Sequence, residues 1–68
     1  MKKQEQYKYY AWLSDKDSNP IEGSDRIISG PSKRWILEMI AYENKVEHLH
    51  NSPIVRLPNG DVWCVRRL

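Results

Sequence analysis

The segment from residue 30 to residue 50 constrains the fold most strongly, because no other stretch of the chain has sustained helical periodicity. Gly30-Pro31 predicts the start of a helix, since a proline at the first helical position has a preset φ and lacks an N–H that would be unpaired there. Apolar residues then recur at alternating steps of four and three along one stripe, which two isoleucines widen. The stripe is Trp35, Met39, Tyr42, Val46 and Leu49, widened by Ile36 and Ile40. One face of this helix must therefore be covered.

The predicted helix ends at Asn51-Ser52-Pro53, because asparagine tolerates a left-handed cap and proline disfavours helical geometry in the residue before it. This gives a helix of about five turns. Leu37 and Ala41 are expected toward the polar side, so the first half of the helix is apolar around most of its circumference. Loops or a partner would have to cover that side.

Strand composition is found before and after this helix. Residues 7–13 are rich in aromatics and contain no turn residue, which is typical of a strand. Residues 54–57 and 61–66 flank Pro58-Asn59-Gly60, in which each residue suits its position in a bulged turn, and this predicts a hairpin. Residues 25–29 are a candidate second strand that would pair antiparallel with the first.

These elements predict a single α+β domain over residues 1–68. Its small antiparallel sheet of three or four strands carries one long helix packed on one face, in the order β-(β)-α-β-β. A domain of this size buries only about 60% of the surface that its unfolded chain exposes. Each aromatic side chain is therefore expected to contribute either to the stability of the core or to binding at a contact surface.

The composition narrows the functional class. Three tryptophans and four tyrosines with no phenylalanine suit surfaces that are half in contact with water, because both side chains carry a polar group. The net charge of +2 comes from 11 basic and 9 acidic residues that are mixed along the chain. A single cysteine, Cys64, excludes an internal disulfide and a cysteine-based zinc site and favours a reducing cytoplasm. The chain has no apolar run long enough for a signal peptide or a membrane span, so we expect a cytoplasmic protein without membrane contact.

Candidate catalytic and metal-binding groups do not form a complete set. Glu43, Glu47 and His50 lie at i, i+4 and i+7 and could hold a divalent metal on one helix edge, although ordinary solvated residues also flank an apolar stripe at these positions. Cys64 lies among valines like a small buried hydrophobe, and no motif connects it to His48 or His50. We therefore predict no enzymatic activity, no cofactor and no metal.

One acidic loop has a partial calcium-binding pattern. Asp15, Asp17 and Asn19 alternate as in the first half of a calcium loop. Pro20 stands where that loop needs a glycine, and Arg26 stands where its closing glutamate would be. We interpret the segment as a flexible acidic loop.

The strands carry more apolar surface than one helix can cover. Period-two alternation places Tyr9, Ala11 and Leu13 on one face of the first strand and Tyr10 and Trp12 on the other. In the last strand the two sets are Val62 and Cys64 against Trp63 and Val65. One set has no internal partner, unless the amino-terminal arm or residues 14–24 fold back over it.

We therefore predict a small non-enzymatic protein-binding module that docks an aromatic face onto a larger protein or onto its own copy. The residues expected on that face are Tyr10, Trp12, Arg56 and Trp63. Trp, Tyr and Arg are the residue types that contribute most binding energy at protein interfaces. Such a chain fits an inhibitor or regulator, including the host-modulating proteins of phages and mobile elements.

The alternative is single-stranded nucleic-acid binding by the same kind of sheet face. Lys8, Arg66 and Arg67, together with Arg56, would surround the rings on which unpaired bases stack. The nine acidic residues and the small net charge count against this alternative.

Overall fold

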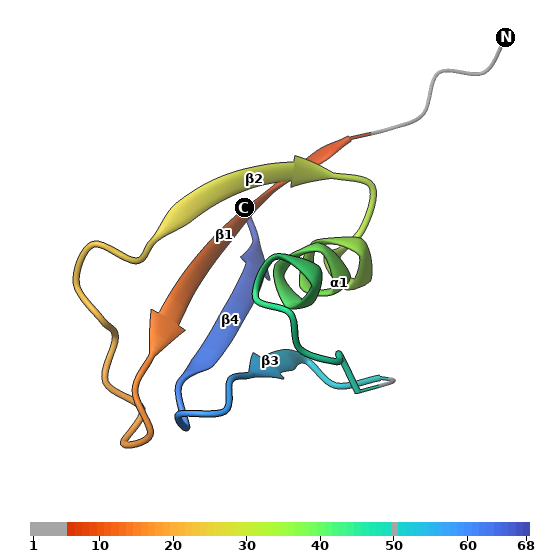
Figure 1. Cartoon of the computed structure of the whole chain (residues 1–68). Helices are drawn as coiled ribbons and strands as arrows, with labels where there is room; N and C mark the ends of the chain where they lie inside the picture. Colours follow the sequence, from red (N-terminus) through yellow and green to blue (C-terminus); the bar gives the residue numbers. More distant parts are fainter. Residues whose placement is uncertain (1–5, 50) are drawn as a thin grey trace, which may run out of the picture.

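The structure, a computed structural model, describes residues 6–49 and 51–68. Four strands and one helix follow in the order β1 (Tyr7–Ser14), β2 (Arg26–Gly30), α1 (Lys33–Glu43), β3 (Ile54–Arg56) and β4 (Val62–Arg67). The strands form one sheet in the order β2-β1-β4-β3, and every neighbouring pair is antiparallel. The helix lies on one side of this sheet (Figure 1). The predicted α+β fold is confirmed, including the second strand.

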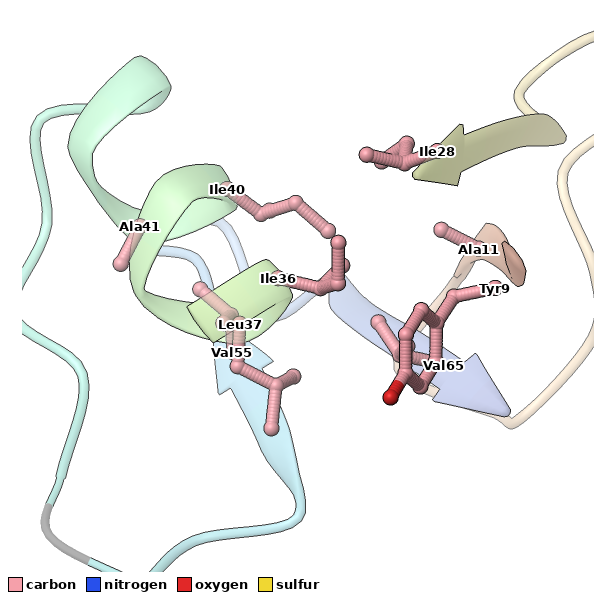
Figure 2. Packing of buried hydrophobic residues seen from close by; sticks show 9 residues of the cluster. All are labelled: Tyr9, Ala11, Ile28, Ile36, Leu37, Ile40, Ala41, Val55 and Val65. Atoms are coloured by element: carbon pink, nitrogen blue, oxygen red, sulfur yellow. The ribbon is translucent and has the colours of Figure 1, made fainter. Parts of the chain in front are cut away.

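The core lies between α1 and the sheet. Each strand of the sheet contributes buried side chains, and the helix contributes four. The cluster is Tyr9, Ala11, Ile28, Val55 and Val65 from the strands with Ile36, Leu37, Ile40 and Ala41 from the helix. In Figure 2, Ile36 and Ile40 point from the helix toward the strands. Burial of this small apolar set is what stabilises the fold.

The hairpin predicted around Pro58-Asn59-Gly60 is present. Ile54 lies opposite Cys64 in the paired strands, and the turn is closed by a hydrogen bond of 2.8 Å from the Leu57 N–H to the Asp61 carbonyl. Gly60 has a φ of 95°, the left-handed region that a residue with a Cβ rarely adopts. Local turn chemistry therefore sets the register of β3 on β4.

The helix is shorter than predicted. It begins after Ser32, whose hydroxyl accepts a hydrogen bond of 3.1 Å from the Trp35 N–H. It ends at Glu43, because Lys45 adopts a left-handed φ of 56° and the chain reverses there. The N–H of Val46 then bonds the Ala41 carbonyl at 3.0 Å, and the N–H of Lys45 bonds the Tyr42 carbonyl at 3.1 Å. These two bonds form a Schellman motif, which has no glycine here and so was not recognisable from composition.

The buried face of the helix also differs from the predicted stripe. Ile36 and Ile40 are buried as expected, but Leu37 and Ala41, which were expected on the polar side, are buried with them. The other stripe residues are half-buried or exposed: Met39 and Val46 are half-buried, while Trp35, Tyr42 and Leu49 are 44%, 85% and 72% exposed. Both sides of this helix are apolar, so periodicity alone could not select between them. The side with the smaller side chains packs on the sheet.

No helix in residues 6–49 and 51–68 is long and apolar enough to cross a membrane.

Candidate interaction surface

The strand register defines a second sheet face that points away from α1. Directly opposed residues of antiparallel strands project to the same side. Tyr10 is opposite both Ile27 and Arg66, and Trp12 is opposite Cys64. This side, called the open face below, carries Lys8, Tyr10, Trp12, Ser14, Ile27, Ser29, Ile54, Arg56, Val62, Cys64 and Arg66. No described helix or strand lies over it (Figure 1).

A stacked aromatic pair stands at the centre of the open face. The rings of Tyr10 and Trp12 have centroids 5.5 Å apart and an angle of 26° between their planes. The guanidinium carbon of Arg66 lies 5.7 Å from the centroid of the Tyr10 ring. Stacking and the cation–π contact fix the two rings in place although both remain partly exposed. A rigid aromatic group loses little conformational entropy when a partner covers it.

A groove of about 730 Å³ lies beside Trp12. Its floor comes from strand residues that include Trp12, Ile54 and Cys64, and its wall comes from four residues of the loop after β1: Asp15, Lys16, Ser18 and Pro20. The loop that follows β1 therefore borders one end of the open face instead of covering it. The amino-terminal arm, the other candidate cover, falls mainly on residues 1–5, which lie outside the described residues.

The groove wall is an ordered turn. The Asp15 carboxylate accepts hydrogen bonds from the backbone N–H groups of Asp17 and Asn19, both at 2.9 Å. The bond from Asn19 is the main reason that the pKa of Asp15 lies below its ordinary value of 3.8. The loop is anchored to β1 by a bond of 2.7 Å from the Ile21 N–H to the Leu13 carbonyl. These contacts differ from the flexible loop that we expected, and they position the groove wall against Trp12.

The open face is more basic than the chain as a whole. Lys8, Arg56 and Arg66 are exposed on it, and none of the described strand residues on this face is acidic. Acidic side chains lie elsewhere. On the helix, Glu43 pairs with Arg26 at 2.8 Å and Glu38 pairs with Arg34 at 3.4 Å. Among the loop residues that line the groove, Asp15 and Lys16 carry opposite charges. The strands of the open face are therefore cationic, although the net charge of the whole chain is only +2.

Two of the predicted site residues lie on the other side of the sheet. Trp63 is opposite Leu13 and Val55, so it projects to the helix side of the sheet, where it is half-buried against the core. Its indole N–H is buried and has no hydrogen-bond partner among the described residues. Arg67 also projects to the helix side, where its guanidinium carbon lies 3.8 Å from the Tyr7 ring centroid. The structure therefore brings together Tyr10, Trp12 and Arg56 with Lys8 and Arg66, but not Trp63 or Arg67.

Sequence reasoning missed Ile27, Ile54 and Cys64 as members of the open face. Ile54 could have been found, because the hairpin turn pairs it with Cys64. The place of Cys64 and Ile27 depends on the register of β1 against β4 and β2, for which the sequence carries no turn signal.

The three residues considered as a metal edge, Glu43, Glu47 and His50, do not lie together on the helix that the structure describes. The helix ends at Glu43, so Glu47 no longer follows it on a helical edge, and His50 lies outside the described residues. Glu43 instead pairs with Arg26, and His48 Nε2 donates to the Ser52 carbonyl at 2.8 Å. Within residues 6–49 and 51–68, no three His, Cys, Asp or Glu side chains gather closely enough to hold a metal ion.

No protein-family model, curated protein or solved structure matches this chain. Functional inference therefore rests on the geometry of the open face.

Proposed function

We propose that this protein is a small non-enzymatic binding module that docks its open face onto a larger protein. The observation that supports this most strongly is the fixed stack of Tyr10 on Trp12, with Arg66 against it and a groove beside it. Aromatic and arginine side chains around a concavity are typical of the energetic centres of protein interfaces. Exposed apolar surface of this kind usually has a partner.

The charges on the open face indicate the chemistry of that partner. Arg66 lies against Tyr10, and Lys8 is the neighbour of Tyr10 on the same face of β1. Arg56 lines the groove beside Trp12, and none of the described strand residues of the open face is acidic. A complementary surface would place carboxylates opposite these three cations and insert an apolar side chain into the groove beside Trp12. We therefore propose an acidic protein surface with a projecting apolar residue as the partner.

An inhibitor or regulator is the role that best fits such a module. A surface that binds a larger protein can block or reposition that protein without any chemistry of its own. Host-modulating proteins of phages and mobile elements act in this way, and we place the present chain among the candidates for that class.

Single-stranded nucleic-acid binding is the second candidate, because Arg66 lies against stacked rings on a sheet face that also carries Lys8 and Arg56. One observation weighs against it. The Tyr10 ring already contacts Trp12 on the same strand and Arg66 on the next, which leaves less ring surface for an incoming base. Arg67, which was expected to help, projects to the helix side.

A capture experiment with matched variants tests the docking surface. Wild type, Trp12→Ala and Tyr42→Ala are compared as baits in a cell lysate, because Tyr42 is an exposed aromatic on the helix, on the other side of the sheet. We expect a specific acidic protein to be retained by wild type and by Tyr42→Ala, to be lost with Trp12→Ala, and to bind less tightly at high salt. Loss from both variants, or from neither, would contradict the assignment.

Cys64 supplies a second readout. It is the only cysteine in the chain and lies opposite Trp12 on the open face. The rate at which a small maleimide modifies this thiol should fall when the purified partner is bound, while an unchanged rate would place the partner elsewhere.

In parallel, titration of a labelled single-stranded oligonucleotide at low and high salt examines the second candidate. Salt-sensitive binding that depends on Trp12, without a protein partner, would support nucleic acid in place of protein.

A further inference from the structure

The two edges of the sheet differ in how they are protected. β3 has only three residues and lies between Pro53 and Pro58, and both short length and flanking prolines limit strand pairing. β2, at the other edge, has five residues in the sequence Arg-Ile-Ile-Ser-Gly and contains neither proline nor lysine. The single charge in β2, Arg26, is already paired with Glu43 of the helix. The β2 edge therefore lacks the features that usually prevent strand addition.

Apolar side chains flank this edge on both faces of the sheet. Ile27 is 62% exposed on the open face. On the helix side, the Trp35 ring lies directly over the end of β2, since a Cβ placed on Gly30 would be only 2.6 Å from its Cε3 atom. Trp35 is itself partly exposed. A strand added beside β2 would cover Ile27 on one side and extend beneath Trp35 on the other.

We propose that β2 pairs with β2 of a second copy of this chain, antiparallel and across a two-fold axis at Ile28. Centring on Ile28, the middle residue of the strand, pairs all five residues of each copy. It places Ile27 opposite Ser29 and Arg26 opposite Gly30, so no like charges face each other. Because the β3 edge is blocked, the pairing closes as a dimer and does not extend into a filament.

This dimer is independent of the proposed partner. A two-fold axis of this kind is perpendicular to the joined sheet, so both helices lie on one side and both open faces lie on the other. The two Tyr10–Trp12 stacks then share one continuous surface. Oligomerisation is also a common source of added stability for domains with a core this small.

Light scattering coupled to size exclusion, with the full chain, tests the proposal. We expect a concentration-dependent species of twice the 8.1 kDa chain mass. Ile27→Lys should weaken the dimer by about tenfold or more, because the two new ammonium groups become diagonal neighbours across the axis. Leu68→Lys is the matched control: Leu68 is 59% exposed at the end of an inner strand, and its replacement adds the same charge away from the β2 edge. This control should dimerise like wild type.

Amide hydrogen exchange locates the contact. Protection of the backbone N–H groups of residues 26–30 should rise with protein concentration in wild type and not in Ile27→Lys. A wild-type monomer at millimolar concentration would overturn the proposal, as would a dimer that Ile27→Lys leaves intact. A dimer that is lost in Trp12→Ala but kept in Ile27→Lys would show that the open face is the self-association surface. If β2 is protected only when a strand of another protein is bound, the second copy is the wrong occupant.

Discussion

Replacement of Gly30 by alanine should destabilise the protein through one close contact. Gly30 ends β2 at the point where the helix crosses it, and its φ is not in the left-handed region. The added Cβ would lie 2.6 Å from Cε3 of Trp35 and 2.7 Å from Cδ1 of Ile36. Trp35 is partly exposed and can turn outward, whereas Ile36 is fully buried and its Cδ1 can shift only within the packed core. The contact with Ile36 therefore sets the minimum loss in the free energy of unfolding that Gly30→Ala causes.

Overpacking of this kind costs about 1–3 kcal/mol. The substitution also reduces the conformational freedom of the unfolded chain, which offsets roughly 0.4–1 kcal/mol of that cost. We expect a net loss of about 1–2 kcal/mol and, for a domain of this length, a fall in Tm of about 4–16 °C. Urea denaturation followed by circular dichroism measures the change in the free energy of unfolding.

A double-mutant cycle separates this contact from a general effect of alanine in the strand. In a Trp35→Ala background the ring is gone and only the Ile36 contact remains, so the cost of Gly30→Ala should fall by at least about 0.5 kcal/mol. Ser29→Ala, at the exposed neighbouring position of β2, should change stability by no more than about 0.5 kcal/mol. An unchanged stability of Gly30→Ala, or an equal cost in both backgrounds, would refute the reasoning.

Three further substitutions probe other parts of the structure. Lys45→Gly should raise the stability by about 1 kcal/mol and Tm by about 4–8 °C, because glycine adopts the left-handed φ of 56° without strain; a loss of stability in thermal melts would contradict this. Ile40→Ala should cost about 2–5 kcal/mol in urea denaturation, since the side chain is fully buried, and a cost below 1 kcal/mol would mean that the helix is not packed as described. The pKa of Asp15 is lower in the folded protein than its ordinary value of 3.8, so the ionised carboxylate stabilises the fold at neutral pH. This stabilisation is lost as the pH falls below 3.8 and passes through the pKa of Asp15 in the folded protein. Carboxyl NMR titration should therefore give a midpoint below 3.8, and Asp15→Asn should increase amide exchange at Asp17 and Asn19.

Local signals in the sequence were sufficient for some elements and not for others. The turn at Pro58-Asn59-Gly60 was predictable because its backbone geometry depends on three adjacent residues. The end of the helix was not, because Lys45 is not a usual stop signal and apolar periodicity continues past it to Leu49. Which side of the helix is buried was also not predictable, because that depends on how closely the sheet can approach each side.

That the sheet would carry an aromatic face could be predicted from the sequence, but which residues lie on that face could not. Surplus aromatic residues on two strand faces indicated a sheet face without an internal cover, and no described helix or strand lies over the open face (Figure 1). The alternation within each strand is readable from the sequence, yet it does not say which alternate set of one strand joins which set of another. That depends on the register between β1 and β4, which places Cys64 beside Trp12 on the open face and Trp63 beside Leu13 on the helix side. Contacts between residues so distant in the chain carry no local signature.

The strand order also has a consequence for biosynthesis. The two inner strands, β1 and β4, are far apart in the chain, and Tyr9 pairs with Arg67 across 58 positions (67 minus 9). A nascent chain that has released β1, β2 and α1 from the ribosome holds a two-stranded hairpin and the helix, but it lacks the inner strand β4 and the core residue Val65. The sheet closes only when residues 62–67 have left the exit tunnel. Until then the edge of β1 that pairs with β4 has no partner, so the four-stranded sheet is complete only after residues 62–67 have been synthesised.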